Sequence, residues 1–202
     1  MSLRRHLIIF TRFPRIGTGK RRLAGEIGAV QALRFQRVTL SLMFRRLGGD
    51  ARWTTWLAVT PDGSGPWPRE FGIIPQGRGD LGQRMARVAK FLPPGPVLIV
   101  GSDTPGLAAD AVARAFRVLD HNDAVFGPAA DGGFWAVGLR RLPRFVDPFR
   151  GVRWSTEHAL ADSLANLPEC AVATLEIMED VDDAKSLARQ PRWACLHPAR
   201  LR

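Results

Sequence analysis

Cysteine and histidine are both scarce in this chain. Only Cys170 and Cys195 occur among its 202 residues, too few for a disulfide scaffold at this length. We therefore expect free thiols in a reducing compartment. The four histidines show no metal-ligand spacing, and none is expected to be catalytic; they are His6, His121, His158 and His197.

Long hydrophobic runs are also missing. The first run, Leu7–Phe10, ends at Thr11-Arg12, and it is too short for a signal peptide and lacks a small-residue cleavage site. No stretch approaches the roughly 18 apolar residues that a transmembrane helix needs. The sequence therefore predicts a cytoplasmic protein without a membrane span.

Lysine is the third scarce residue: Lys20, Lys90 and Lys185 are the only lysines among 29 basic residues. The net charge is +10, but the arginines are scattered and form no run of five or more. A basic field favours polyanionic ligands such as nucleotides. Because no nucleic-acid-binding motif accompanies it, we expect no specific nucleic-acid partner.

Strand and helix patterns alternate along the whole chain. Apolar residues make up 46% and charged residues 24%, as in an ordinary globular protein, and we expect one domain over residues 1–202. This βα alternation predicts an α/β fold with three α/β/α layers and a mostly parallel sheet. The expected strands are 6–11, 53–60, 72–75, 97–100, 123–127, 134–139 and 171–177, and the expected helices are 23–46, 81–92, 107–119, 156–167 and 181–188.

Asp103 stands where a buried strand ends. The apolar run Val97–Val100 is typical of a parallel strand, and ligands of open α/β sheets bind beyond the carboxyl ends of such strands. A carboxylate there can hold a hard divalent cation that is shared with substrate phosphates. The alternative is a helix N-cap, in which Asp103 or Thr104 opens the helix near Leu107.

The loop from Thr11 to Lys20 joins the first strand to the first helix. Its glycines and the helix start can approach a phosphate, and Lys20 can add a mobile charge. A P-loop is excluded by Pro14 and Arg21, and a dinucleotide fingerprint by Arg22. The alternative is a plain turn with solvated arginines.

Five ordered sequence blocks identify a family resemblance. The first is carried by Phe10, Arg12, Pro14, Gly17, Lys20, Arg22 and Leu23, and the others are Gln76–Met85, Gly101–Leu107, Gly127–Trp135 and Trp154–Thr156. The pattern resembles the DUF2064 family of GT-A-fold, glycosyltransferase-like transferases, and it is more distantly similar to phospholactate and molybdenum-cofactor guanylyltransferases. It runs from about Phe10 to Leu187.

The resemblance implies roles for particular residues. It implies nucleotide contacts by Arg12, Gly17, Lys20, Arg22, Gln76, Gly79 and Asp80, with catalytic roles for Asp103 and Lys20. It implies a Mg²⁺ or Mn²⁺ ion on Asp103 and on Asp182 of the late motif Val181–Leu187, with Asp131 and Asp180 as substitutes. Acceptor contacts are expected from Asp131, Gly132, Gly133, Trp154, Ser155 and Thr156.

Simpler structural roles remain open for several of these residues. Asp131–Gly133 could be only a hairpin turn, Ser155 or Thr156 could be a helix N-cap, and Trp154 could be a core anchor. The acidic residues from Glu179 to Asp183 could be a solvated, capping run.

The resemblance implies a metal-dependent transferase with a nucleotide or nucleotide-sugar donor and a small-molecule acceptor. Either a sugar or a nucleotidyl group could be transferred. Thr104-Pro105 follow Asp103, so the D-x-D motif of many glycosyltransferases is not present. The alternative is a non-catalytic protein that binds nucleotides or sugar nucleotides.

Overall fold

A central sheet organises this computed structural model, which describes residues 3–190 and 193. The strand order is β3-β2-β1-β4-β6-β5-β7, and β6 runs antiparallel to β4 and β5 whereas the other neighbours are parallel. The strands are β1 (His6–Arg12), β2 (Thr54–Thr60), β3 (Gly72–Pro75), β4 (Val97–Gly101), β5 (Ala124–Pro128), β6 (Phe134–Leu139) and β7 (Val172–Thr174). The sheet is mostly parallel, as predicted.

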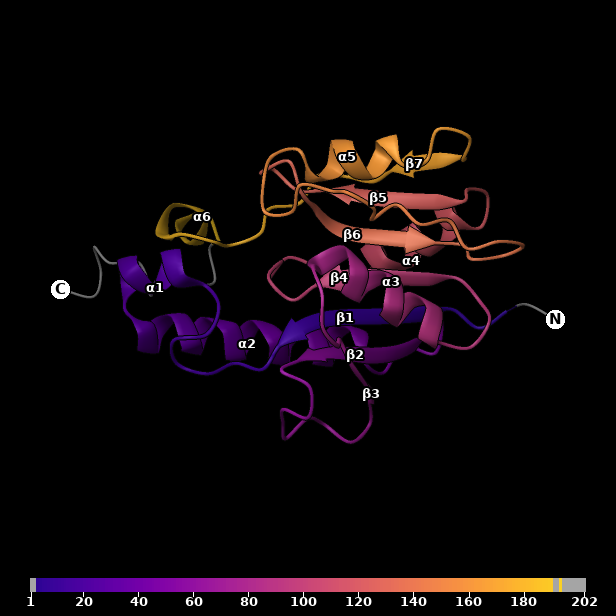
Figure 1. Cartoon of the computed structure of the whole chain (residues 1–202). Helices are drawn as coiled ribbons and strands as arrows, with labels where there is room; N and C mark the ends of the chain where they lie inside the picture. Colours follow the sequence, from indigo (N-terminus) through magenta and orange to yellow (C-terminus); the bar gives the residue numbers. More distant parts are fainter. Residues whose placement is uncertain (1–2, 191–192, 194–202) are drawn as a thin grey trace.

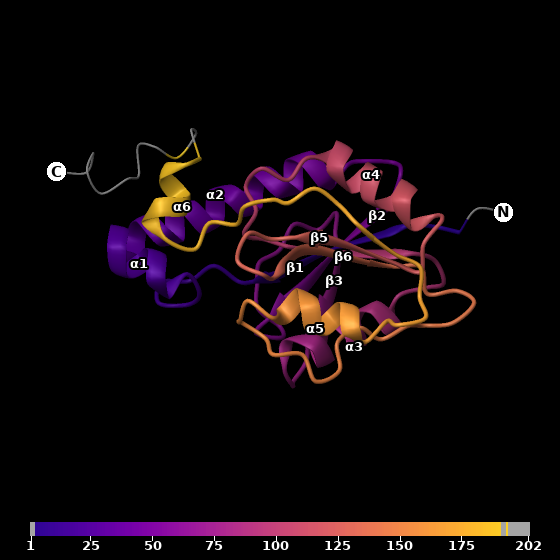
Figure 2. The same cartoon turned by 90° about the horizontal axis from the view of Figure 1, so that it is seen from above.

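Helices cover both faces of this sheet (Figures 1 and 2). On one face α2 (Ala29–Leu47) and α4 (Ala109–Leu119) bury apolar residues against the strands. On the other face α3 (Leu81–Phe91) and the segment around α5 (Ala159–Ala165) enclose a second core. The predicted three-layer fold is confirmed, since each face of the sheet is hydrophobic and is covered by amphipathic helices.

Two short helices, α1 (Arg21–Ile27) and α6 (Ala184–Ala188), lie beyond the carboxyl ends of β1 and β4 (Figure 1). Together with the start of α2 they form a third core that includes Leu23, Phe35 and Leu187. The prediction of one continuous helix from Leu23 to Arg46 is therefore wrong. Gly28 has a φ of 89°, a backbone conformation that favours glycine, and it separates α1 from α2.

Three other predicted elements are shorter in the structure than in the sequence pattern. The helix expected over 156–167 is α5, the strand over 171–177 is β7, and the helix over 181–188 is α6. Residues that flank α5 and α6 form turns and caps instead, and among the described residues beyond β7 only Met178 makes an isolated bridge, with Ala129. Cys195 and His197 lie outside the described residues.

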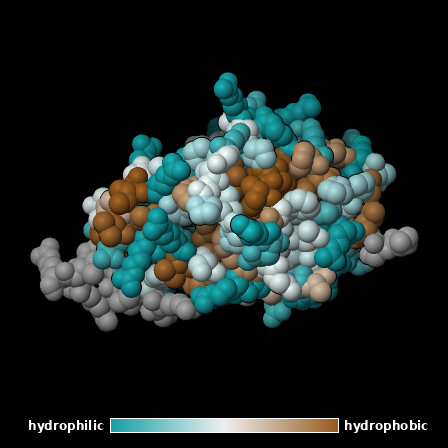
Figure 3. All heavy atoms as spheres, turned by 90° about the horizontal axis from the view of Figure 1, so that it is seen from below, coloured by the Kyte–Doolittle hydropathy of each residue, from teal (hydrophilic) through white to brown (hydrophobic). Residues whose placement is uncertain are grey.

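The surface carries both hydrophobic and hydrophilic side chains. On the face shown in Figure 3, hydrophobic side chains appear in separate patches among hydrophilic ones. No helix in the described part of the chain is both long enough and apolar enough to cross a membrane.

Candidate functional site

Two adjoining cavities lie at the carboxyl ends of β1 and β4. The first, which we call the basic cavity, has a volume of about 220 Å³ and is lined by residues of the β1–α1 loop together with Gln76 and Arg84. The second, the acidic cavity, has a volume of about 750 Å³ and lies among the segments 129–135, 154–159 and 180–182. Asp103 and Leu81 line both, so a ligand group in one cavity can meet a ligand group in the other.

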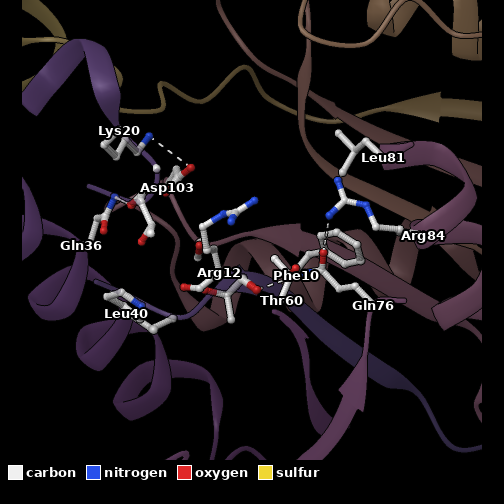
Figure 4. A pocket seen from close by; sticks show the side chains of 15 residues that line it. Phe10, Arg12, Lys20, Gln36, Leu40, Thr60, Gln76, Leu81, Arg84 and Asp103 are labelled. Atoms are coloured by element: carbon white, nitrogen blue, oxygen red, sulfur yellow. Dashed lines mark hydrogen bonds and ion pairs between the residues drawn. The ribbon is translucent and has the colours of Figure 1, made fainter. Parts of the chain in front are cut away.

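Three cationic side chains line the basic cavity: Arg12, Lys20 and Arg84. Figure 4 shows Arg12 between the Lys20–Asp103 pair on one side and Arg84 on the other. Burial, with the nearby charge of Arg12, lowers the pKa of the Arg84 guanidinium. A phosphate chain between these groups would relieve their repulsion and satisfy their donors.

Gln76 sits at the floor of the basic cavity, with only 1% of its surface exposed. Its Nε2 donates to the backbone carbonyls of Thr11 (3.0 Å) and Ala58 (2.8 Å), and its Oε1 accepts from Arg84 Nη1 at 2.9 Å. Both ends of the amide are therefore engaged, and Gln76 positions Arg84 rather than presenting a free edge to a base. The sequence pattern gave Arg84 no separate role, although it stands four residues after Asp80 in the same block.

Gly79 and Asp80 shape the start of α3. The Asp80 carboxylate accepts a hydrogen bond from the backbone of Gln83 at 2.8 Å and completes a capping box. Gly79 has a φ of 108°, and a Cβ there would lie 2.2 Å from the Gln83 side chain. The structure thus gives both residues a role in building the helix that carries Arg84, and their contact with a nucleotide stays a prediction.

Gly17 and Arg22, two predicted nucleotide contacts, do not line the basic cavity. Gly17 has a φ of 77° in the β1–α1 loop, a conformation that keeps this turn tight. The Arg22 side chain is 75% exposed, lines the acidic cavity and pairs with Asp183 at 3.4 Å. The Arg22 guanidinium lies beside the predicted phosphate region, but it is paired with the Asp183 carboxylate.

Lys20 forms ion pairs with both Asp103 and Asp182. Its Nζ lies 3.2 Å from Asp103 Oδ2 and 2.6 Å from Asp182 Oδ1, and its side chain is only 4% exposed. Burial alone lowers the pKa of this ammonium, but the two carboxylates outweigh it and raise the pKa above its usual value. The structure therefore brings Asp182 beside Asp103, as the late aspartate motif suggested, although their metal-ligand role stays a prediction.

The N-cap alternative for Asp103 and Thr104 is wrong. Helix α4 begins at Ala109, and its N-cap is Ala108 without a side-chain hydrogen bond. The Asp103 backbone carbonyl instead accepts from Val181 at 3.2 Å, which fixes the segment that carries Asp182. The Asp103 carboxylate, 51% exposed, remains open to both cavities.

A group of three acids lies next to this pair. Asp131, Asp180 and Asp182 each offer a carboxylate oxygen, and these oxygens lie within 4.8 Å of one another. Burial and the charges of Asp182 and Asp131 raise the pKa of Asp180 to about 6. The neighbouring acids have other partners, since Asp183 caps α6 and Glu179 pairs with Arg189.

The β5–β6 turn carries Asp131, Gly132 and Gly133. Asp131 Oδ1 accepts from the Gly133 backbone at 2.9 Å, so this segment is a hairpin turn, and it also lines the acidic cavity. Gly132 has a φ of 84°, and a Cβ there would lie 2.2 Å from the backbone carbonyl oxygen of Glu157. Only glycine lets the turn pack this closely on the segment that follows Trp154.

Trp154, Ser155 and Thr156 also line the acidic cavity. The Trp154 ring packs edge-on to Phe134, with centroids 6.2 Å apart, so it serves as both a core contact and a cavity wall. Ser155 has a φ of 62°. Ser155 or Thr156 was expected to cap the next helix, but the N-cap of α5 is His158. Thr156 Oγ1 accepts a hydrogen bond from the His158 backbone at 3.2 Å.

Comparison with known proteins places this geometry in a family. The family model described as "Uncharacterized protein conserved in bacteria (DUF2064)" matches residues 29–156. No curated protein sequence matches the chain.

Solved structures share the fold. The "putative nucleotide-diphospho-sugar transferase" of Desulfovibrio desulfuricans G20 aligns with a TM-score of 0.82 at 23% identity, over 100% of this chain and 94% of the other. Rv0371c of Mycobacterium tuberculosis H37Rv in complex with manganese gives 0.56 at 15% identity, over 94% and 98%. The 4-diphosphocytidyl-2C-methyl-D-erythritol synthase of Anaerococcus prevotii DSM 20548 gives 0.59 at 9%, over 95% and 98%. The chain therefore has the expected nucleotide-diphospho-sugar transferase fold.

Proposed function

Because this chain belongs to the DUF2064 family, and because its two cavities differ in charge, we propose that it is a metal-dependent transferase that uses an activated nucleotide. The whole chain would act as one domain, with the donor in the basic cavity and the acceptor in the acidic cavity. The observation that carries the proposal is the position of Asp103, which lines both cavities and contacts the buried Lys20.

The basic cavity suits the phosphates of the donor. Arg12 and Arg84 converge on it without an acid between them in Figure 4, and Lys20 borders it beside Asp103. In a transfer reaction the bond to the departing diphosphate breaks, and the electron pair stays on its oxygen. Charge develops there, and preorganised cations stabilise it more strongly in a partly enclosed site than in water.

The acids beside Lys20 fit a divalent cation. Three carboxylates whose oxygens lie within 4.8 Å of one another form the hard oxygen donor set that Mg²⁺ and Mn²⁺ prefer. When bound, such a cation would neutralise charge on the phosphates. We propose Asp182 as the central ligand, with Asp131 and Asp180 as its nearest partners. Asp103 would join them on a movement of Lys20 toward the phosphates.

Two transfer reactions fit this arrangement. In glycosyl transfer an acceptor attacks the sugar and a nucleoside diphosphate leaves, whereas in nucleotidyl transfer a phosphorylated acceptor attacks the α-phosphate and pyrophosphate leaves. A non-catalytic nucleotide-binding protein is the rival. The buried Lys20 pairs with both Asp103 and Asp182, and two further acids lie beside Asp182. This arrangement favours catalysis, because nucleotide binding alone does not require it.

The test is a thermal-shift panel of nucleoside triphosphates and sugar nucleotides, each with and without Mg²⁺ or Mn²⁺. A ligand at a hundredfold excess over its dissociation constant stabilises a protein by about 2.7 kcal/mol. Stabilisation by triphosphates alone supports nucleotidyl transfer, and stabilisation by sugar nucleotides alone supports glycosyl transfer. Ligand binding that is indifferent to metal, with no turnover of the ligand, supports the non-catalytic rival.

Lys20→Ala and Lys90→Ala form a matched pair for this panel. Both remove one lysine charge, but Lys90 lies over the Phe145 ring, at 4.7 Å, and lines neither cavity. We expect the nucleotide-induced shift to be lost only in Lys20→Ala. Equal shifts in the two variants would contradict the assignment of the phosphate site.

A further inference from the structure

The acidic cavity has a chemistry that selects among acceptors. We infer that it binds a neutral, hydroxyl-rich molecule of the sugar or polyol class and rejects phosphorylated or carboxylated acceptors. The inference rests on the proposed function, because it takes this cavity as the acceptor site. The volume of about 750 Å³ is within the range of small-molecule sites.

The charge of the cavity disfavours an anionic acceptor. Its lining carries five carboxylates and one cationic side chain, Arg22, among the described residues. That guanidinium is paired with Asp183, and the adjacent Lys20 offsets only one of the charges of Asp103 and Asp182. Even with a divalent cation on Asp131, Asp180 and Asp182, these three carboxylates would keep a net negative charge. An acceptor phosphate would meet repulsion here, in contrast to the basic cavity.

The polar groups of the cavity instead match hydroxyl groups. A carboxylate only accepts hydrogen bonds, and a hydroxyl both donates and accepts. Asp131 uses Oδ1 for the Gly133 backbone, so Oδ2 can accept from a ligand. The Glu157 side chain, 80% exposed, adds a second acceptor at the rim of the same cavity.

Trp154 and Phe134 supply apolar surface beside these acceptors. Their rings line the cavity and pack edge-on to each other, with centroids 6.2 Å apart. They offer apolar area to the C–H face of a sugar ring. Because Trp154 Nε1 is itself buried, the ring and not its N–H meets the ligand.

The test uses matched neutral and phosphorylated probes on the full chain. Methyl α-D-glucopyranoside is paired with glucose 6-phosphate, methyl α-D-mannopyranoside with mannose 6-phosphate, and glycerol with glycerol 3-phosphate. The protein has six tryptophans, and it is labelled with ¹⁵N-tryptophan. Binding is followed by NMR through the indole N–H signals, with and without nucleoside diphosphate and Mn²⁺. The indole signal that is missing from the spectrum of Trp154→Phe is assigned to Trp154.

We expect at least one neutral probe to move the Trp154 signal and to bind about tenfold or more tightly than its phosphorylated partner. Trp154→Leu should weaken that probe about five- to tenfold, because it removes the aromatic face from the cavity wall, without changing nucleotide affinity. Trp67→Leu is the matched control, because Trp67 lines neither cavity.

Two results overturn the inference while leaving the proposed function standing. One is tighter binding of the phosphorylated member of each pair, and the other is a Trp154 signal that no probe moves although nucleotide and Mn²⁺ bind. Failure of the proposed function is different, since neither nucleotide nor Mn²⁺ would then bind at all.

Discussion

Replacing Asp180 by asparagine should stabilise the metal-free protein at neutral pH. Burial, with the charges of Asp182 and Asp131, raises the pKa of Asp180 from its ordinary value of 3.8 to about 6. The folded state therefore holds a proton that the unfolded state has released between these two pH values. Stability falls as pH rises through that window, and above about pH 6 the full cost of the ionised carboxylate is present.

The size of the effect follows from the pKa shift. A shift of about two units corresponds to about 3 kcal/mol, and Asp180 is only half-buried, so solvent screening reduces it to about 1–2 kcal/mol. For a chain of this size that is about 3–6 °C in Tm. Asp180→Asn should thus melt at the wild-type temperature near pH 4 and about 3–6 °C above it at pH 7.5, in differential scanning fluorimetry with a chelator.

The same substitution should act in the opposite direction when metal is added. If Asp180 is a ligand, millimolar Mn²⁺ raises the wild-type Tm at pH 7.5 and raises that of Asp180→Asn much less. Glu179→Gln is the control, because that neighbouring acid pairs with Arg189 and its removal relieves no repulsion. A Tm for metal-free Asp180→Asn that is below wild type by the same amount at both pH values would refute the reasoning.

Three further substitutions test the site and its scaffold. Asp103→Asn should leave the fold intact, because Asp103 caps no helix, and should lower Tm only modestly, because Lys20 keeps Asp182 as a partner; it should abolish metal-dependent nucleotide binding in calorimetry. Arg84→Ala should weaken binding of a nucleoside triphosphate about tenfold and leave the nucleoside nearly unchanged, since it removes a charge-assisted contact; equal losses would point to a structural role. Gly132→Ala should lower stability in urea titrations by about 1–3 kcal/mol, because a Cβ there clashes with backbone at a φ of 84°. Gly101→Ala is its control, with no atom within 4 Å of the added Cβ.

The strands were predictable because their patterns reflect burial on both faces. The expected bounds of β3 and β6 match those observed; β1, β2 and β4 differ by one residue at one end, and β5 by one residue at each end. The break at Gly28 was missed because apolar residues recur at helical spacing on both sides of it. Periodicity reports which residues are buried, and it does not report a change in the direction of the helix axis.

The candidate site was predictable in its location but not in its contacts. The positions of Asp103 and Lys20 follow from strand ends that converge at one edge of the sheet. The role of Gln76 does not, because a glutamine can bind a base or a backbone equally well. Only the fold shows that its amide is already engaged by Thr11, Ala58 and Arg84.

The partition of charge between the two cavities also depends on the fold. The chain as a whole is strongly basic, so its composition predicts that any binding site on it would favour an anionic ligand. Yet the segments that carry Asp131, Asp180 and Asp182 meet at one place, and Lys20 turns toward Asp103 and Asp182. This meeting of distant segments creates an acidic surface next to a basic one. A transferase needs such a contrast when its donor is a polyanion and its acceptor is neutral, because the two ligands are then drawn to different sides of the same carboxylate.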